Sequence, residues 1–260
     1  YGSIADASIT DLFVAGVVPG LLMGLGLIVA AMLMGRKMDL KVLPKASGKE
    51  RLQAFKDAFW GLLMPVIILG GIYGSVFTPT EAAAVSVFYG LIVGVFIYHE
   101  IDFKKMKDIL VDSCSTTATV MFITMGATLF GYVLTRARLD LAIKDFMLNI
   151  TGGSTVIFFI IVNIVLLIAG CFLDSTSALY IFTPLFAPVA LQLGIDPIHL
   201  GTVMIVNLAP PVGVNLYVAC GIGDIKIEEI TKGIIPCLLA ELVVLLLVTY
   251  IPSLSLMFVG

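Results

Sequence analysis

The sequence predicts an all-α, polytopic membrane protein on three observations. Hydrophobic residues make up 60% of the 260 residues and charged residues only 13%, with a mean hydropathy of +1.11. The period-two alternation of membrane β-strands is absent from the apolar stretches. Several stretches also approach the roughly 20 apolar residues that a helix needs to cross about 30 Å of hydrocarbon. These stretches are 12–34, 58–77, 82–98, 113–135, 153–173, 178–195 and 233–259.

Basic residues gather in two loops. Seven of the 15 Lys and Arg residues lie in 36–56, and Lys104, Lys105 and Lys107 follow the run 82–98. The positive-inside rule places both loops in the cytoplasm, and the two runs between them give the required parity. Residues 1–11 are then outside. The net charge of −3 is too small to indicate nucleic acid or another highly charged partner.

Two segments far apart in the chain resemble each other. DASITDLFVAGVVPGLL (6–22) and DIKIEEITKGIIPCLL (224–239) both end in Gly-[Val/Ile]-[Val/Ile]-Pro-x-Leu-Leu and both open an apolar run. Internal repeats of this kind are typical of secondary transporters. We therefore expect 1–22 to be the end of a first repeat whose body precedes Tyr1.

FTPTEAAAV (77–85) has the pattern of a helix start. Thr78 suits the N-cap, Pro79 suits the first helical position, and Glu81 completes a capping box. A functional role for this membrane-edge carboxylate is the alternative.

LTRARLDLAIKDF (134–146) is predicted to be an interfacial amphipathic helix, with i,i+4 pairs Arg136–Asp140 and Asp140–Lys144. Attraction of an anionic substrate by Arg136 or Arg138 is the alternative interpretation.

The first polar island lies in GCFLDSTSALYIFTP (170–184), where Asp174, Ser175, Thr176 and Ser177 interrupt apolar sequence. A charged group at mid-membrane costs roughly 2.5–3.5 kcal/mol. An N-cap formed by Asp174 or Ser175 would explain the residues structurally. Even so, a helix break at membrane depth is tolerated only where it lines a cavity or is buried in protein. Oxygen donors on broken helices are typical Na⁺ ligands, so we favour a cation site.

The second polar island is VNLAPPVGVNLYVACGIG (206–223), which contains Asn207, Pro210, Pro211, Gly213 and Asn215. Two adjacent prolines must interrupt a helix. The two islands lie close in sequence and are both rich in oxygen donors, so we expect one composite site.

A rival interpretation is an intramembrane aspartyl protease, because 221–224 matches the motif GxGD and Asp174 offers a second carboxylate to Asp224. Two features oppose it: Leu173, not Tyr, precedes Asp174, and Asp224 opens the charged stretch DIKIEE. Motifs of metalloproteases, serine hydrolases and P-loop ATPases are absent, and both histidines are isolated. We therefore predict that the chain is not an enzyme. A passive anion channel is a third possibility.

Four motifs in order (FTPTEAAAV, GCFLDSTSALYIFTPLFAPVA, GIDPIHLGTVMIVNLA and PPVGVNLYVACGIG) resemble the large membrane subunit of TRAP (tripartite ATP-independent periplasmic) transporters. The resemblance covers essentially the whole chain and matches the C-terminal part of that subunit. It implies an inverted-repeat elevator transporter with helical hairpins and broken helices, driven by Na⁺. The implied divisions are 1–11 (end of the first repeat), 12–112 (scaffold, with the basic loop 36–56 and an amphipathic arm), 113–223 (transport domain) and 224–260 (C-terminal membrane helix).

The same resemblance implies partners and a location. A small four-helix membrane subunit would extend the scaffold, and a periplasmic binding protein would deliver a small carboxylate, such as a C4-dicarboxylate or a sialic acid. Overall similarity favours the sialic-acid branch. The protein would reside in the bacterial inner membrane as a multi-pass subunit.

The resemblance also implies site residues, which are carried over motif by motif. Those implied for substrate are Asp174, Ser175, Thr176, Ser177 and Asn215. Those implied for Na⁺ are Asp174, Thr176, Ser177, Asn207, Pro210 and Gly213. The chain departs from the family where Ala209 runs directly into Pro210, without the usual short run containing Gly and Thr. We expect that a few residues have dropped out of the numbering there, which a Cα–Cα distance well beyond 3.8 Å would reveal.

Overall fold

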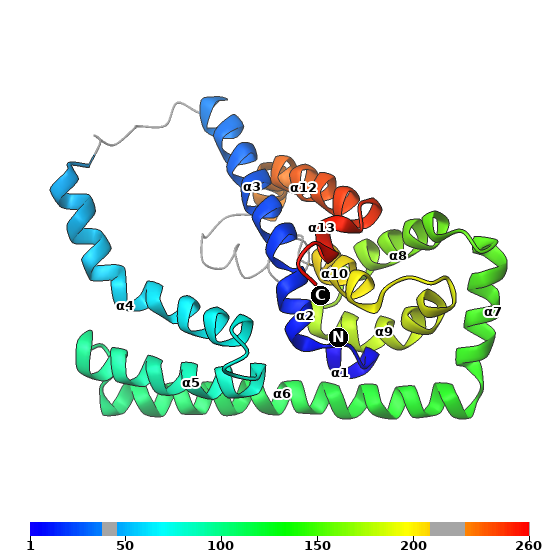
Figure 1. Cartoon of the computed structure of the whole chain (residues 1–260), viewed down its shortest axis with the longest axis horizontal. Helices are drawn as coiled ribbons and strands as arrows, with labels where there is room; N and C mark the ends of the chain where they lie inside the picture. The colour runs from blue at the N-terminus through cyan, green and yellow to red at the C-terminus, as the bar shows by residue number, and fades with distance from the viewer. Residues whose placement is uncertain (38–45, 209–226, 260) are drawn as a thin grey trace. The chain divides into compact units, whose positions relative to one another are not determined.

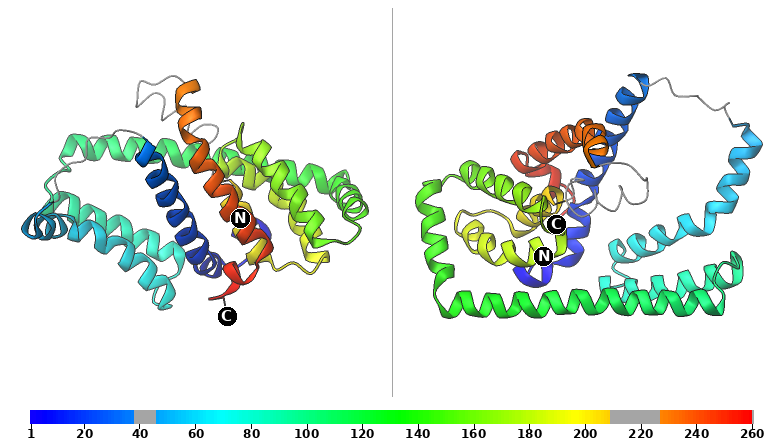
Figure 2. Two further views of the ribbon diagram at one scale, coloured as in Figure 1. Left: turned by 90° about the horizontal axis from the view of Figure 1, so that it is seen from above. Right: turned by 180° about the vertical axis from the view of Figure 1, so that it is seen from behind.

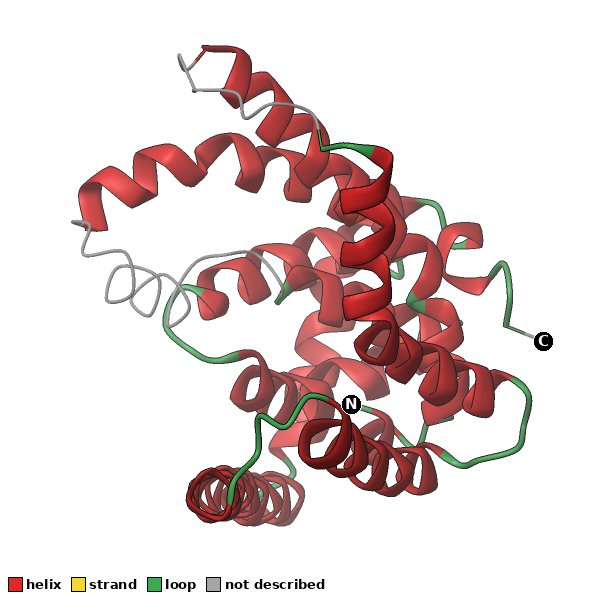
Figure 3. Cartoon of the chain, turned by 90° about the vertical axis from the view of Figure 1, so that its left-hand side faces the viewer, coloured by secondary structure: helices red, strands yellow, loops and turns green. Residues whose placement is uncertain are grey.

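The computed structural model describes residues 1–37, 46–208 and 227–259. Within these ranges the chain is helical and has no β-strand, as Figure 3 shows, which confirms the predicted all-α class. The chain forms two compact units, Leu40–Thr119 and Tyr1–Asp39 with Val120–Gly260. The assignment of residues to a scaffold and a transport domain stays a prediction.

The unit Leu40–Thr119 contains α4 (Gly48–Tyr73), α5 (Pro79–Ile92), the π-helix η1 (Val93–Ile97) and the start of α6 (Phe103–Arg136). Capping boxes open α4 and α5. At α5, Thr78 and Glu81 form the box and Pro79 takes the first position, as predicted.

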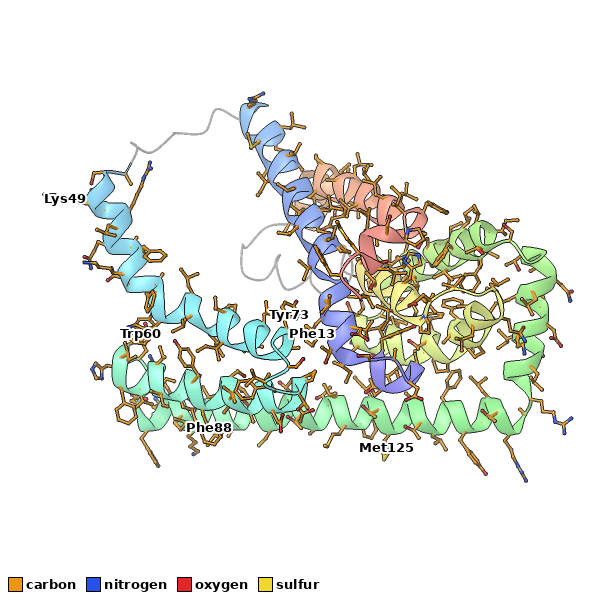
Figure 4. All side chains as sticks on the ribbon, in the orientation of Figure 1. Phe13, Lys49, Trp60, Tyr73, Phe88 and Met125 are labelled. Carbon is orange, nitrogen blue, oxygen red and sulfur yellow. The ribbon has the colours of Figure 1, made fainter. Side chains whose placement is uncertain are left out.

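Large apolar side chains cover the outside of this unit. Trp60 on α4 and Phe88 on α5 have exposed fractions of 39% and 69% (Figure 4). Such exposure suits helices that face lipid. Two tyrosine hydroxyls of this unit donate hydrogen bonds to backbone carbonyls. Tyr89 donates to the Trp60 carbonyl at 2.7 Å, and Tyr98 donates to the Asp57 carbonyl at 2.7 Å.

The larger unit, whose helices are labelled in Figure 1, has a buried core of apolar side chains. Fully buried side chains of α8 and α10 include Phe158, Leu166, Leu200 and Met204. The helices of this unit, besides the end of α6, are α1 (Gly2–Ala5), α2 (Ile9–Ala15), α3 (Val17–Lys37), α7 (Leu139–Thr151), α8 (Thr155–Gly170), α9 (Ser175–Gln192), α10 (Pro197–Asn207), α12 (Ile227–Tyr250) and α13 (Ser253–Leu256).

The two similar segments lie on helices that pack together. α3 runs beside α12 (Figure 2). Gly26 faces α12, and a Cβ there would make an ordinary van der Waals contact with Val244 Cγ2 at 3.5 Å. Their starts differ, since α3 begins after a break at Gly16, whereas α12 continues through Pro236.

Five helical segments of the described ranges are long and apolar enough to cross a bilayer: Ile9–Arg36, Gly48–Tyr73, Pro79–Ile97, Phe103–Arg136 and Gly233–Tyr250. A sixth results if Leu141–Thr151 and Thr155–Gly170, bent by 118°, form one span. The predicted run 178–195 corresponds to α9, which is outside this set. α9 begins with three hydroxyl residues and contains Pro184 and Pro188, so it is less apolar than the five segments.

The prediction of one amphipathic helix over 134–146 is wrong. α6 ends at Arg136, Arg138 adopts φ 52°, and α7 begins at Leu139. Arg136 and Asp140 therefore belong to different helices and do not form the expected helical pair. Asp140 and Lys144 keep the i,i+4 spacing within α7.

Candidate functional site

The first polar island is a helix break capped by Asp174. α8 ends at Gly170, and the backbone N–H groups of Phe172 and Leu173 close a turn on the Ala169 carbonyl at 2.9 and 2.8 Å. The Asp174 carboxylate accepts from the backbone N–H of Ser177 at 3.1 Å and from its hydroxyl. The structural interpretation of Asp174 as an N-cap is thus confirmed, and so is the break.

The Asp174 carboxylate is capped but stays at the surface. Two oxygens offer about four lone-pair positions. Ser177 occupies two of them, and the backbone N–H groups of Thr176 and Asp174 also face the carboxylate. The side chains of Asp174, Ser175 and Thr176 are exposed. They remain accessible to a ligand at the end of the helix.

The second island reaches the same place. The Ser175 hydroxyl donates to the carbonyl of Leu208 at 2.9 Å, which joins the first turn of α9 to the C-cap residue of α10 (Pro197–Asn207). The described parts of the two islands therefore meet, as expected of a composite site.

Asn207 is the buried polar residue of this junction, with an exposed fraction of 1%. Its Nδ2 donates to Asn163 Oδ1 on α8 at 2.9 Å, and Asn163 Nδ2 donates in turn to Thr249 Oγ1 on α12 at 3.3 Å. This chain of hydrogen bonds fixes the amide, so that its nitrogen faces α8. Asn207 Oδ1 has no hydrogen-bond partner within the described structure.

An acceptor buried without a partner costs about 1–3 kcal/mol. An amide oxygen held in one orientation is also a hard ligand of the kind that Na⁺ and similar cations take. The two helix ends joined by the Ser175–Leu208 bond therefore offer a carboxylate, hydroxyls and an amide oxygen, which are donors of the kind that a hard cation takes.

Asn163 and Thr249 had no predicted role. Asn163 is the one strongly polar residue of the apolar run 153–173. Its isolation among apolar residues is the feature of the sequence that could have indicated a buried polar role. Nothing in the sequence pairs Asn163 with partners 44 and 86 residues away.

Several predicted residues lie outside the described ranges: Pro210, Gly213, Asn215 and the GxGD segment 221–224. The expected gap between Ala209 and Pro210 lies there too. Their roles stay predictions.

Helices that can cross a bilayer, together with a polar helix break, are features typical of membrane transport proteins. Residues 1–254 match the family model of the tripartite ATP-independent periplasmic transporter, DctM component. The chain belongs to this family, as the sequence motifs indicated.

Three relatives illustrate the range of the family. The C4-dicarboxylate TRAP transporter large permease protein DctM of Pseudomonas aeruginosa is 42% identical over 98% of this chain and 61% of its own length. The isethionate TRAP transporter permease protein DctMQ of Oleidesulfovibrio alaskensis is 41% identical over 100% of this chain and 42% of its own length. The sialic acid TRAP transporter large permease protein SiaM of Vibrio cholerae is 39% identical over 99% of this chain and 61% of its own length.

The chain thus spans between about two fifths and three fifths of these relatives. They are permeases, which confirms the prediction that the chain is not an enzyme and leaves the protease interpretation without support.

Proposed function

We propose that this chain is the C-terminal part of a permease that takes up a small organic anion by Na⁺-coupled secondary transport across the bacterial inner membrane. A periplasmic binding protein delivers the substrate, a small membrane subunit completes the scaffold, and access alternates by an elevator movement. The substrate is a carboxylate of the C4-dicarboxylate or sialic-acid type.

The observation that carries this proposal is the junction of Asp174, Ser175 and Asn207. The Ser175–Leu208 bond holds two helix ends together at a break, one with a carboxylate and hydroxyls and the other with a buried amide oxygen. These oxygens suit a cation that has left its water shell.

The helix ends also separate opposite charges. The N-terminus of α9 carries a partial positive charge, and the C-terminus of α10 carries a partial negative one. The Asp174 carboxylate already meets the first, so a cation is favoured beside that carboxylate and the second, and the bound cation would attract an anionic substrate. Neighbouring cation and anion would stabilise each other, which is the physical basis that we propose for coupling.

The relatives support an anionic substrate, because C4-dicarboxylates, isethionate and sialic acid are all anions. Their identities of 42%, 41% and 39% do not separate the substrates, so the preference for sialic acid stays a prediction.

The test is uptake into proteoliposomes that contain the full-length permease and its small subunit, with the binding protein outside. Radiolabelled sialic acid, a C4-dicarboxylate and isethionate are supplied with an inward gradient of Na⁺ or of K⁺. We expect uptake of one substrate that needs both the binding protein and Na⁺. Uptake that is indifferent to the gradient would overturn the coupling and favour a passive channel.

A further inference from the structure

The first half of α4 differs from the second half in its charge. Residues 48–60 include five charged residues, whereas residues 61–73 include none. Every residue of 48–60 is exposed. α4 has 26 residues, which is more than the roughly 20 that cross a bilayer, so we expect its charged first half to extend beyond the hydrocarbon.

A bend near Trp60 separates the two halves of α4 (Figures 1 and 4). The Tyr98 hydroxyl donates to the Asp57 carbonyl at 2.7 Å and accepts from the Gly61 N–H at 3.3 Å. In a regular α-helix these two backbone groups would bond to each other. Pro65 also has no N–H to offer to the Gly61 carbonyl. An inserted side chain and a proline both bend helices, so the first half turns away from the direction of the second.

The first half of α4 has an apolar face and an acidic face. Leu52, Phe55 and Phe59, at positions i, i+3 and i+7, share one side of the helix. Their exposed fractions are 57%, 55% and 42%, so the described part of the chain leaves this side largely uncovered. Glu50 and Asp57 are seven residues apart and lie on the opposite side.

The basic side chains border the apolar face. Lys49 and Lys56 are seven residues apart and lie along one edge of it, and Arg51 lies along the other edge. Long basic side chains can lie along apolar surface and hold their charges at its polar boundary. The two carboxylates on the far side already accept hydrogen bonds from neighbouring groups. The rim of the apolar face therefore carries three cations and no carboxylate.

An apolar face bordered by cations suits the surface of a bilayer that contains anionic lipid. The basic loop 36–56, which includes the start of α4, is predicted to be cytoplasmic. We propose that residues 48–60 form a surface anchor that binds anionic phospholipid of the cytoplasmic leaflet. The three basic side chains hold headgroup phosphates, and the apolar face enters the acyl region.

The test is hydrogen exchange of residues 48–60, measured by mass spectrometry on the full-length permease and its small subunit in nanodiscs. Discs of phosphatidylcholine are compared with discs that also contain phosphatidylglycerol. One basic residue at an anionic surface contributes about fivefold to binding. Exchange of 48–60 should therefore slow at least about fivefold with phosphatidylglycerol, while exchange of 61–73 should stay the same. Equal exchange of 48–60 in both discs would overturn the proposal, and slow exchange in both would indicate a protein cover instead.

A triple variant locates the effect by removing the cations at the rim: Lys49→Gln, Arg51→Gln and Lys56→Gln. Glutamine keeps the helix, and the other four basic residues of 36–56 maintain the orientation. The dependence on phosphatidylglycerol should disappear.

The matched control removes as many charges from the exposed start of α6: Lys104→Gln, Lys105→Gln and Lys107→Gln. In this control the dependence of 48–60 on phosphatidylglycerol should persist. The proposal fails if the dependence survives in the first variant, or if the control loses it equally. Because the measurement needs no uptake, its outcome is independent of Na⁺ coupling.

Discussion

The two ends of α10 make an instructive comparison. Each end holds a buried polar atom without a hydrogen-bond partner in the described structure, Asn207 Oδ1 at one and His199 Nε2 at the other. Each also lies near an aspartate that caps a helix, Asp174 for α9 and Asp196 for α10. A capping role alone therefore does not separate a structural aspartate from a functional one.

The surroundings of the two ends differ. Around Asn207 the hydrogen-bond partner is the Asn163 amide, and the Ser175–Leu208 bond joins a hydroxyl and a backbone carbonyl at the same end of α10. Oxygens of these kinds suit a bare metal cation. Around His199 the neighbours are the Ser255 hydroxyl, the Asp196 carboxylate that already caps α10, and apolar residues such as Phe159, and they do not call for a cation.

The largest effect on the Na⁺ requirement is expected from Asn207→Leu, which removes the buried amide oxygen and nearly keeps the side-chain volume. Loss of a ligand to a charged group costs about 1.5–3 kcal/mol, so the Na⁺ concentration for half-maximal uptake should rise roughly tenfold or more. Uptake measured against Na⁺ concentration in proteoliposomes checks this. An unchanged Na⁺ dependence would remove Asn207 from the cation site.

A smaller effect is expected from Asn163→Ala, which leaves Asn207 intact but frees its amide to rotate. The Na⁺ requirement should rise roughly three- to tenfold while the maximal rate stays similar, because orientation and not a ligand is lost. The same uptake assay measures it.

Thr183→Val is the matched control for Asn163→Ala. Thr183 on α9 is fully buried, and its hydroxyl lacks a partner in the described structure. Its replacement should leave Na⁺ dependence unchanged and stability equal or higher. If Thr183→Val shifts the Na⁺ requirement as much as Asn163→Ala does, general core disturbance explains both.

The smallest functional effect is expected from Thr78→Ala in the other unit. Loss of this capping box should lower the free energy of unfolding by about 1 kcal/mol and leave the Na⁺ requirement unchanged. Thermal unfolding and uptake, measured side by side, check it. A changed Na⁺ requirement would revive the functional interpretation of Glu81.

Local features were predictable from sequence and long-range ones were not. The break at Gly170, the cap at Asp174 and the capping box at Thr78 depend on residues within a few positions of each other. The bonds Ser175–Leu208 and Asn163–Thr249 depend on how helices pack, which no local pattern encodes.

The break between α6 and α7 was missed for a different reason. Arg138 carries the left-handed conformation there, which favours glycine or asparagine, so its residue type gives no signal. His199 was set aside as an isolated histidine, because its partner Ser255 lies 56 residues away.

The central claim is that the Asp174 carboxylate serves a cation and not only the cap of α9. The most direct test is the unfolding temperature of the full-length permease and its Asp174→Asn variant, measured with increasing Na⁺ against K⁺ at constant ionic strength. Asparagine caps a helix as well as aspartate, so the two proteins should unfold alike without Na⁺. The account predicts that Na⁺ raises the unfolding temperature of the wild type saturably and does not raise that of the variant. Equal stabilisation of both proteins by Na⁺ would contradict it.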